Sequence, residues 1–128
     1  QKDIDRINRI FALDSVEAIF AALEADGSEW AAAHRATLGA KSPQAMKVSF
    51  RQMREGATMA SFTDEMKSEY RIASRVCAVH DFQEGVRALI VDKDNKPVWN
   101  PARLEAVSDV LLNELFAPLP DDEEWTPL

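Results

Sequence analysis

The chain contains very little cysteine, histidine and glycine. Its 128 residues include one cysteine, two histidines and four glycines. With Cys77 alone, no disulfide can form within the chain, and its apolar neighbours Val76 and Val79 predict a buried, unreactive thiol. No Cys/His spacing suits zinc, and the scattered glycines form no phosphate-binding loop.

Long apolar runs and an excess of positive charge are also missing. No apolar run approaches the length of a membrane-spanning helix, so we expect no membrane contact. The net charge is −7 at pH 7, which argues against a nucleic-acid partner. The acidic run Asp121-Asp122-Glu123-Glu124 predicts a solvated tail. No signal peptide is recognisable, and we expect a cytoplasmic protein, or one of the mitochondrial matrix if the source is eukaryotic.

Apolar residues recur at helical spacing along nearly the whole chain, and no segment has a convincing strand pattern. The sequence therefore predicts an all-α fold of six or seven short helices. Capping side chains indicate where helices begin: Asp14 or Ser15, Ser28, Ser42-Pro43, Ser61 or Thr63, Asp81, and Ser108. Asp26-Gly27 and Gly39 indicate two helix ends.

Two of the predicted helices have an apolar face opposite a charged face. Each large apolar side chain contributes about 1.5–3 kcal/mol when it is covered, so we expect the apolar faces to be buried. The faces expected to be buried are Met46, Phe50, Met53 and Ala57 in one helix and Met66, Tyr70, Ala73 and Cys77 in the other. The faces expected to be solvated are Lys47, Arg51 and Glu55, and Lys67, Arg71 and Arg75.

The most specific pattern is DFQEGVRALIVDKDNKPVWNP, residues 81–101. Asp81 and Glu84 have the spacing of a capping box at a helix start. Gly85 in the first turn would let another backbone approach closely. A charged turn follows, and Trp99, flanked by prolines, is expected to pin the loop onto a helical surface, with stacking on an adenine as the alternative.

This pattern resembles the signature near the C-terminus of the 3-hydroxyisobutyryl-CoA hydrolases, a branch of the crotonase (enoyl-CoA hydratase/isomerase) superfamily. Four other stretches resemble the same region in the same order: SEWA at 28–31, KSP at 41–43, RQMREG at 51–56 and EYRIA at 69–73. The resemblance covers nearly the whole chain. It implies that residues 1–128 are a single helical C-terminal region of such an enzyme, without its ββα core.

The resemblance implies hydrolysis of a CoA thioester, typically of a branched 3-hydroxyacyl group in valine breakdown. Backbone N–H groups then polarise the thioester carbonyl, the CoA thioester is the substrate, and no covalently bound cofactor is expected. Those groups belong to an N-terminal core whose oxyanion loop and βαβ pattern this sequence lacks, so we assign no catalytic residue to it. We expect the chain to cover the acyl-CoA pocket and, lacking its core, to self-associate through Phe50, Met53, Met66 or Tyr70.

Arg87, Lys93 and Lys96 are the candidate binding residues. They cluster in one short segment of an otherwise acidic chain, and point charges at this spacing suit the pyrophosphate and 3′-phosphate of coenzyme A. The alternative is that these cations form ion pairs with Asp92 and Asp94.

The other polar candidates have simpler expected roles. His34 lies on an apolar helix face, where a core or boundary role is expected. His80 precedes Asp81, where a structural role in the turn between helices is expected. Glu65 and Glu69 are expected on a charged outer face rather than as an acid–base pair. Asp92-x-Asp94 begins like a calcium loop, but a lysine and a proline replace the later ligand and the required glycine, so no metal site is predicted.

Two other functions stay open. The first is a non-enzymatic helical interaction module or small subunit that pairs with a separate core chain. The second is the C-terminal part of an enoyl-CoA hydratase or isomerase. In hydratase relatives an aromatic ring near the CoA adenine occupies the position of Leu89, whereas the DKDxxPxW loop favours the hydrolase.

Overall fold

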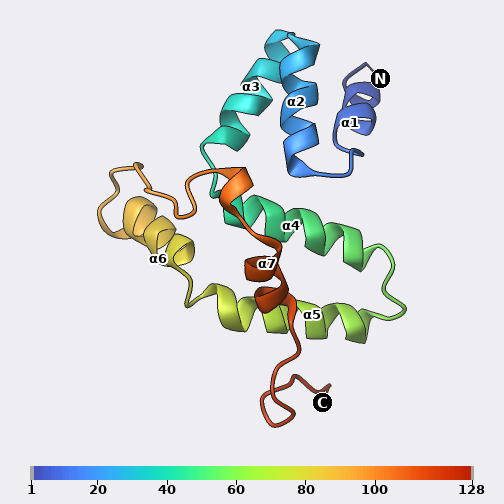
Figure 1. The fold of residues 1–128 in the computed structure, drawn as a ribbon, viewed down its shortest axis with the longest axis vertical. Coiled ribbons are helices and arrows are strands. Elements are labelled where there is room, and N and C mark those ends of the chain that lie inside the picture. Colours follow the sequence, from blue (N-terminus) through green and yellow to red (C-terminus); the bar gives the residue numbers. More distant parts are fainter. Residues whose placement is uncertain (1, 128) are drawn as a thin grey trace. The chain divides into compact units, whose positions relative to one another are not determined.

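The computed structural model describes residues 2–127, and all the regular secondary structure in these residues is helical (Figure 1). The α-helices are α1 (Lys2–Ile10), α2 (Val16–Asp26), α3 (Glu29–Gly39), α4 (Pro43–Gly56), α5 (Phe62–Val76), α6 (His80–Val86) and α7 (Asp109–Phe116). A π-helix, η1 (Arg87–Val91), follows α6, and a 3-10 helix, η2 (Leu104–Ala106), precedes α7. The predicted all-α fold is confirmed. The chain divides into two compact units, residues 1–41 and 42–128, so the single region expected from the sequence stays a prediction.

The first unit contains α1, α2 and α3. The predicted capping residues mark where α2 and α3 begin. The hydroxyl of Ser15, rather than Asp14, accepts the backbone N–H of Ala18 at 3.0 Å and begins α2. Gly27 ends that helix in a left-handed conformation with φ 64°, a region that glycine enters at no steric cost. Ser28 then caps α3.

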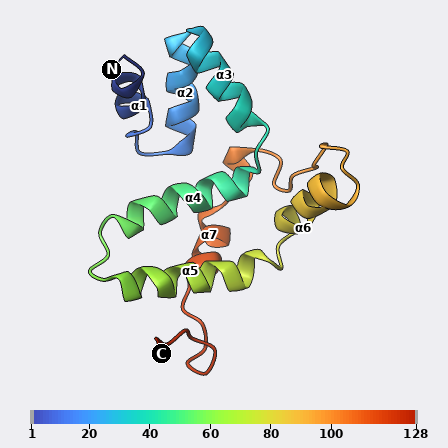
Figure 2. The ribbon, with the colours of Figure 1, turned by 180° about the vertical axis from the view of Figure 1, so that it is seen from behind.

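The second unit is built around α4 and α5, with α7 lying between them (Figures 1 and 2). Its core is formed by one residue each from α4 and α5, two from α7, and one from the segment before α7: Val48, Ile72, Leu112, Leu115 and Val107. Ser42, Ser61 and Ser108 cap α4, α5 and α7 as predicted, each accepting a backbone N–H three residues ahead.

The predicted buried faces of α4 and α5 are wrong. Met53 is 78% exposed and Tyr70 is 41% exposed, whereas Val48 and Ile72 are buried. Cys77, expected to be buried, is also exposed. The core of this unit therefore lies on a different side of both helices from the one with the largest apolar side chains.

Basic residues explain this difference, because several predicted solvent-facing cations turn toward α7 and the segments around it. Arg75 donates to the carbonyls of Ala117 at 2.6 Å and Pro118 at 2.9 Å, and so satisfies acceptors just beyond the end of α7. Arg71 pairs with Glu124 at 2.8 Å, so the acidic tail is bound there rather than fully solvated. Long cationic side chains cover apolar surface with their stems while their charged ends find acceptors.

The corrected core assignment predicts a large difference between two substitutions in α5. Replacing Ile72 by alanine should lower the free energy of unfolding by about 2–4 kcal/mol, because a buried side chain is lost and a cavity is left. Replacing Tyr70 by alanine should cost about 1 kcal/mol or less. Urea unfolding followed by circular dichroism measures both, and an equal loss for the two variants would contradict this core.

Candidate functional site

The segment predicted to carry the site is attached to the rest of its unit through Asp81. This carboxylate is only 6% exposed. It accepts a hydrogen bond from the hydroxyl of Ser42, at the start of α4, and another from the backbone N–H of Asn100 at 2.7 Å. The ring Nδ1 of His80 lies 3.1 Å from the same carboxylate, which agrees with the structural role expected for that histidine.

The predicted capping box is therefore wrong. Helix α6 begins at His80 with Val79 as its N-cap, and this cap makes no side-chain hydrogen bond. Because the helix starts before Asp81, this residue lies within the first turn and both its oxygens are used by other segments. No feature of the sequence indicates the pairing with Ser42, which lies 39 residues away.

Glu84 and Gly85 hold the returning loop against α6. Glu84 accepts the backbone N–H of Val98 at 2.9 Å. A Cβ on Gly85 would meet the ring of Trp99 at 3.6 Å, so the group that approaches this glycine is an indole and not a backbone. The prediction that Trp99 pins the loop onto a helix is confirmed.

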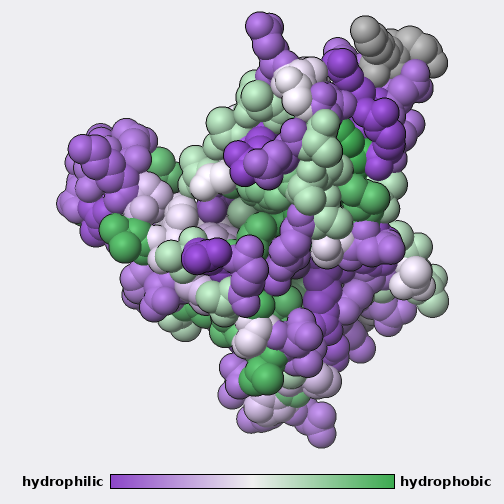
Figure 3. Space-filling model, turned by 45° about the horizontal axis from the view of Figure 1, so that its top comes forward, coloured by the Kyte–Doolittle hydropathy of each residue, from purple (hydrophilic) through white to green (hydrophobic). Residues whose placement is uncertain are grey.

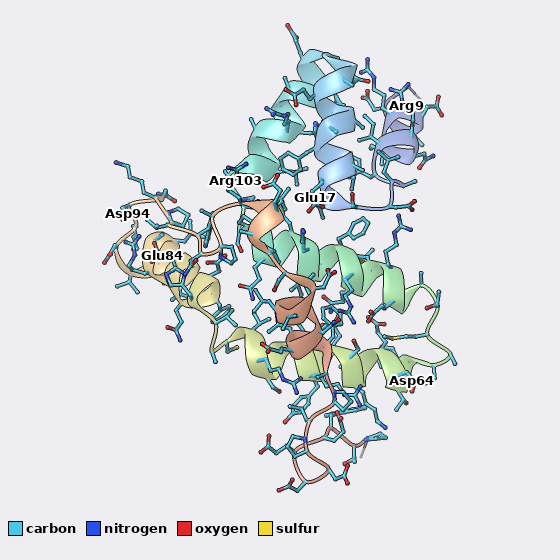
Figure 4. All side chains as sticks on the ribbon, in the orientation of Figure 1. Arg9, Glu17, Asp64, Glu84, Asp94 and Arg103 are labelled. Atoms are coloured by element: carbon cyan, nitrogen blue, oxygen red, sulfur yellow. The ribbon has the colours of Figure 1, made fainter. Side chains whose placement is uncertain are left out.

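Arg87 is the centre of a cluster of charged side chains. Its guanidinium donates to Glu84 at 2.7 and 2.9 Å, to Asp92 at 2.7 Å and to Asp94 at 2.7 Å. Figure 4 shows Glu84 and Asp94 on the same part of unit 2, at the α6 helix and the loop that follows it. The hydrogen bonds from Arg87 and then from Val98 lower the pKa of Glu84 to about 2, and Arg87 likewise lowers the pKa of Asp94. These carboxylates in turn raise the pKa of Arg87 above its ordinary value.

The backbone around Arg87 is shaped to bring these carboxylates together. The π-helical turn of η1 places the N–H of Asp92 2.8 Å from the carbonyl of Arg87. Lys93 and Asn95 then adopt left-handed conformations, each with φ 55°, and the N–H of Asn95 returns to the carbonyl of Ala88 at 3.0 Å. The chain thus makes a tight loop around one guanidinium.

The three predicted binding residues lie in η1 and the loop that follows it. Arg87 is surrounded by carboxylates, whereas the two lysines face solvent. Arg87 is half-buried and paired, which matches the ion-pair alternative raised from the sequence. Lys93 and Lys96 are exposed, and within residues 2–127 neither ammonium group has an ion pair. The lysines are therefore the cations that a ligand in solvent can reach.

Apolar side chains are exposed next to this charged loop. Leu89, Ile90 and Val91 are 58%, 66% and 67% exposed. In Figure 3 the part of unit 2 formed by α6 and its exit loop is mostly hydrophilic, with hydrophobic surface at its border. A second apolar surface is a groove of about 630 Å³ between the end of α4 and the start of α5, lined by Met53, Met59 and Phe62 among others.

The remaining candidates are not part of this loop. His34 is exposed and its Nδ1 lies 2.7 Å from the carbonyl of Trp30, so it is not the core or boundary residue that was expected. Glu65 and Glu69 line the groove between α4 and α5. Among the described residues no group of acidic, histidine or cysteine side chains could hold a metal ion, and no helix there is long and apolar enough to cross a membrane.

The chain matches the model of a known enzyme family over most of its length. It belongs to the enoyl-CoA hydratase/isomerase family, whose model it matches over residues 1–116. The chain is 43% identical over 120 residues to mitochondrial 3-hydroxyisobutyryl-CoA hydrolase of Gallus gallus. The matched residues make up 94% of this chain and 31% of that protein. The same enzyme of Dictyostelium discoideum is 41% identical over 119 residues. The resemblance noted in the sequence is confirmed.

Two solved structures are similar to the chain. A carnitinyl-CoA dehydratase from Mycobacterium thermoresistibile is 31% identical with a TM-score of 0.86, over 94% of this chain and 34% of that one. An enoyl-CoA hydratase from Rhodobacter sphaeroides 2.4.1 is 34% identical with a TM-score of 0.85, over 95% of this chain and 36% of the hydratase chain. The chain thus spans about a third of the length of the proteins it matches.

The lowered pKa of Glu84 predicts a pH-dependent contribution to stability. Its pKa falls from 4.5 to about 2 on folding, so the stabilisation is fully present above pH 4.5 and is lost as the pH falls toward 2. The melting temperature of wild type should exceed that of Glu84→Gln most above pH 4.5, and the difference should close toward pH 2. A Glu105→Gln variant is the control, and a difference independent of pH would contradict the assignment.

Proposed function

We propose that this chain is the helical C-terminal part of a CoA thioester hydrolase of the 3-hydroxyisobutyryl-CoA hydrolase type. One observation carries the proposal: more than nine-tenths of the chain is about 40% identical in sequence to enzymes of that name. Those enzymes are about three times as long as this chain. The remaining two thirds of such an enzyme would supply the catalytic groups, since no catalytic residue is assigned here.

In this proposal the chain covers the acyl-CoA pocket and packs against the rest of the enzyme. The exposed apolar residues Met53, Phe62 and Ile90 support this role, because large exposed apolar surfaces are typical of surfaces that contact another protein part. The CoA thioester would be the substrate, without a covalently bound cofactor. We place the enzyme in the mitochondrial matrix if its source is eukaryotic, because the similar hydrolase of Gallus gallus is mitochondrial, and otherwise in the cytoplasm.

The loop of Arg87, Lys93 and Lys96 is proposed as the part of the chain that binds the phosphates of coenzyme A. The two exposed ammonium groups support this, because among residues 2–127 neither is held in an ion pair, so both offer positive charge to a ligand in solvent. The second candidate function is hydration or dehydration of an acyl-CoA, which is favoured because the two similar structures are a carnitinyl-CoA dehydratase and an enoyl-CoA hydratase.

A hybrid enzyme tests the proposed function. Replacing the matching 120 residues of the Gallus gallus hydrolase with this chain should preserve hydrolysis of 3-hydroxyisobutyryl-CoA, to within about tenfold in kcat/KM. The 128-residue chain alone should give no turnover. Release of free CoA thiol measures both reactions.

Two controls separate the alternatives for the hybrid. A version carrying Ile72→Ala in the core should lose activity through instability, which shows that the chain must fold to contribute. Hydration of crotonyl-CoA in place of thioester cleavage would favour the hydratase function. A hybrid that folds but has neither activity would favour the interaction-module function, and turnover by the isolated chain would refute the proposal.

Self-association of the isolated chain is a separate prediction. We expect concentration-dependent association through the groove between α4 and α5, where Met53 and Phe62 are each 78% exposed. Sedimentation velocity should show a larger species at high concentration, and the double variant Met53→Ser, Phe62→Ser should lose it. Val110→Ser, exposed on α7, is the matched control. A wild-type chain that stays monomeric at high concentration would contradict this prediction.

A further inference from the structure

We infer that Arg87 is a positioning residue that fixes the loop of residues 92–98, so that Lys93 and Lys96 are held ready for the phosphates of a CoA thioester. The inference rests on the proposed function, because the ligand is the one named there. It assigns different roles to the three cations: two lysines bind, and the arginine holds the loop that carries them.

The hydrogen bonds of Arg87 leave it no donor for a ligand. Its Nε donates to Glu84, its Nη1 to Asp92 and Asp94, and its Nη2 to Glu84 and to the carbonyl of Lys96 at 3.3 Å. A guanidinium has five N–H donors, and these five bonds use all of them. A phosphate could bind Arg87 only by displacing one of these acceptors.

The loop conformation requires such support. Lys93 and Asn95 both have φ 55°, a region that residues other than glycine occupy rarely and keep only when their surroundings fix it. The acceptors that fix it are on this loop and on α6: the N–H of Lys96 donates to Asp94 at 2.8 Å and that of Val98 to Glu84 at 2.9 Å. Arg87 bonds to both of these carboxylates and holds them in place.

A change of local charge can separate two effects on phosphate binding: positioning of the loop that carries the lysines, and electrostatic attraction of the phosphate. Glu84, Asp92 and Asp94 carry three negative charges, and Arg87 offsets one of them. Removing the charge of Glu84 makes the surroundings of the lysines more positive, so attraction alone would strengthen phosphate binding. Positioning has the opposite consequence, because the same change weakens the bonds to Val98 and Arg87.

The experiment measures kcat and KM of the hybrid enzyme with Glu84→Gln and Arg87→Gln. Both variants should raise KM for the CoA thioester by roughly three- to tenfold, the effect of losing about one charge-assisted hydrogen bond, and should change KM more than kcat. With a 3′-dephospho-CoA thioester the increase should be smaller. Asp121→Asn, which makes the same charge change as Glu84→Gln at an exposed position in the tail, should leave KM unchanged.

Hydrogen exchange provides a readout without substrate. In the isolated 128-residue chain, the amides of Asn95, Lys96 and Val98 should exchange faster in Arg87→Gln than in wild type, whereas those of α5 should not change. Unchanged exchange in the loop would overturn the inference whatever the ligand is. A lower KM for Glu84→Gln would also overturn it, because attraction would then dominate.

The double variant Lys93→Ala, Lys96→Ala separates failure of this inference from failure of the proposed function. It should raise KM and leave exchange of the Val98 amide as in wild type. If KM does not change, the lysines do not contact the phosphates as proposed. The inference then fails because it assumes that contact. If KM rises in the lysine variant but not in Arg87→Gln, the contact exists and the positioning role of Arg87 is refuted.

Discussion

One buried carboxylate holds the candidate site in place. Asp81 is the point at which α6 meets the start of α4 and the end of the returning loop, through the hydroxyl of Ser42 and the N–H of Asn100. A buried carboxyl group is tolerated only when its oxygens are hydrogen-bonded, and here the two bonds come from different segments. Position and orientation of the whole loop relative to α4 therefore depend on this side chain.

Two acids one turn apart on α6 perform the same task on the loop. Asp81 accepts the N–H of Asn100, and Glu84 accepts the N–H of Val98. Residues three apart share one face of a helix, so the loop can run along that face with alternate N–H groups bonded to it. The indole of Trp99 lies between these two bonds and packs on Gly85, which closes the arrangement on its apolar side.

The helices and most of their caps could be predicted from the sequence because they depend on neighbouring residues. Ser28, Ser42, Ser61 and Ser108 each satisfy a backbone N–H three positions ahead, so local order is enough to identify them. Asp81 shows where this approach fails. Its spacing to Glu84 is also that of a capping box, and only the contact with Ser42 decides between the two roles.

The buried faces of α4 and α5 were mispredicted for a related reason. The pattern gave weight to Met53 and Tyr70, which are large, and treated Arg71 and Arg75 as solvated. In the structure these arginines find acceptors in Glu124 and in carbonyls after α7, which no local pattern indicates. Of the candidate site, the cluster of three cations could be predicted, whereas the division of roles among them depends on which carboxylates the loop brings to Arg87.

The bonds made by Arg71 and Arg75 also bear on where this unit should be considered to end. The family match stops at residue 116, yet Ala117, Pro118 and Glu124 supply the acceptors for both guanidinium groups. A boundary drawn at the end of that family match would remove Glu124 as the acceptor for Arg71, and the carbonyls of Ala117 and Pro118 as acceptors for Arg75. Hydrogen bonding therefore extends the folded unit beyond the last residue of the family match.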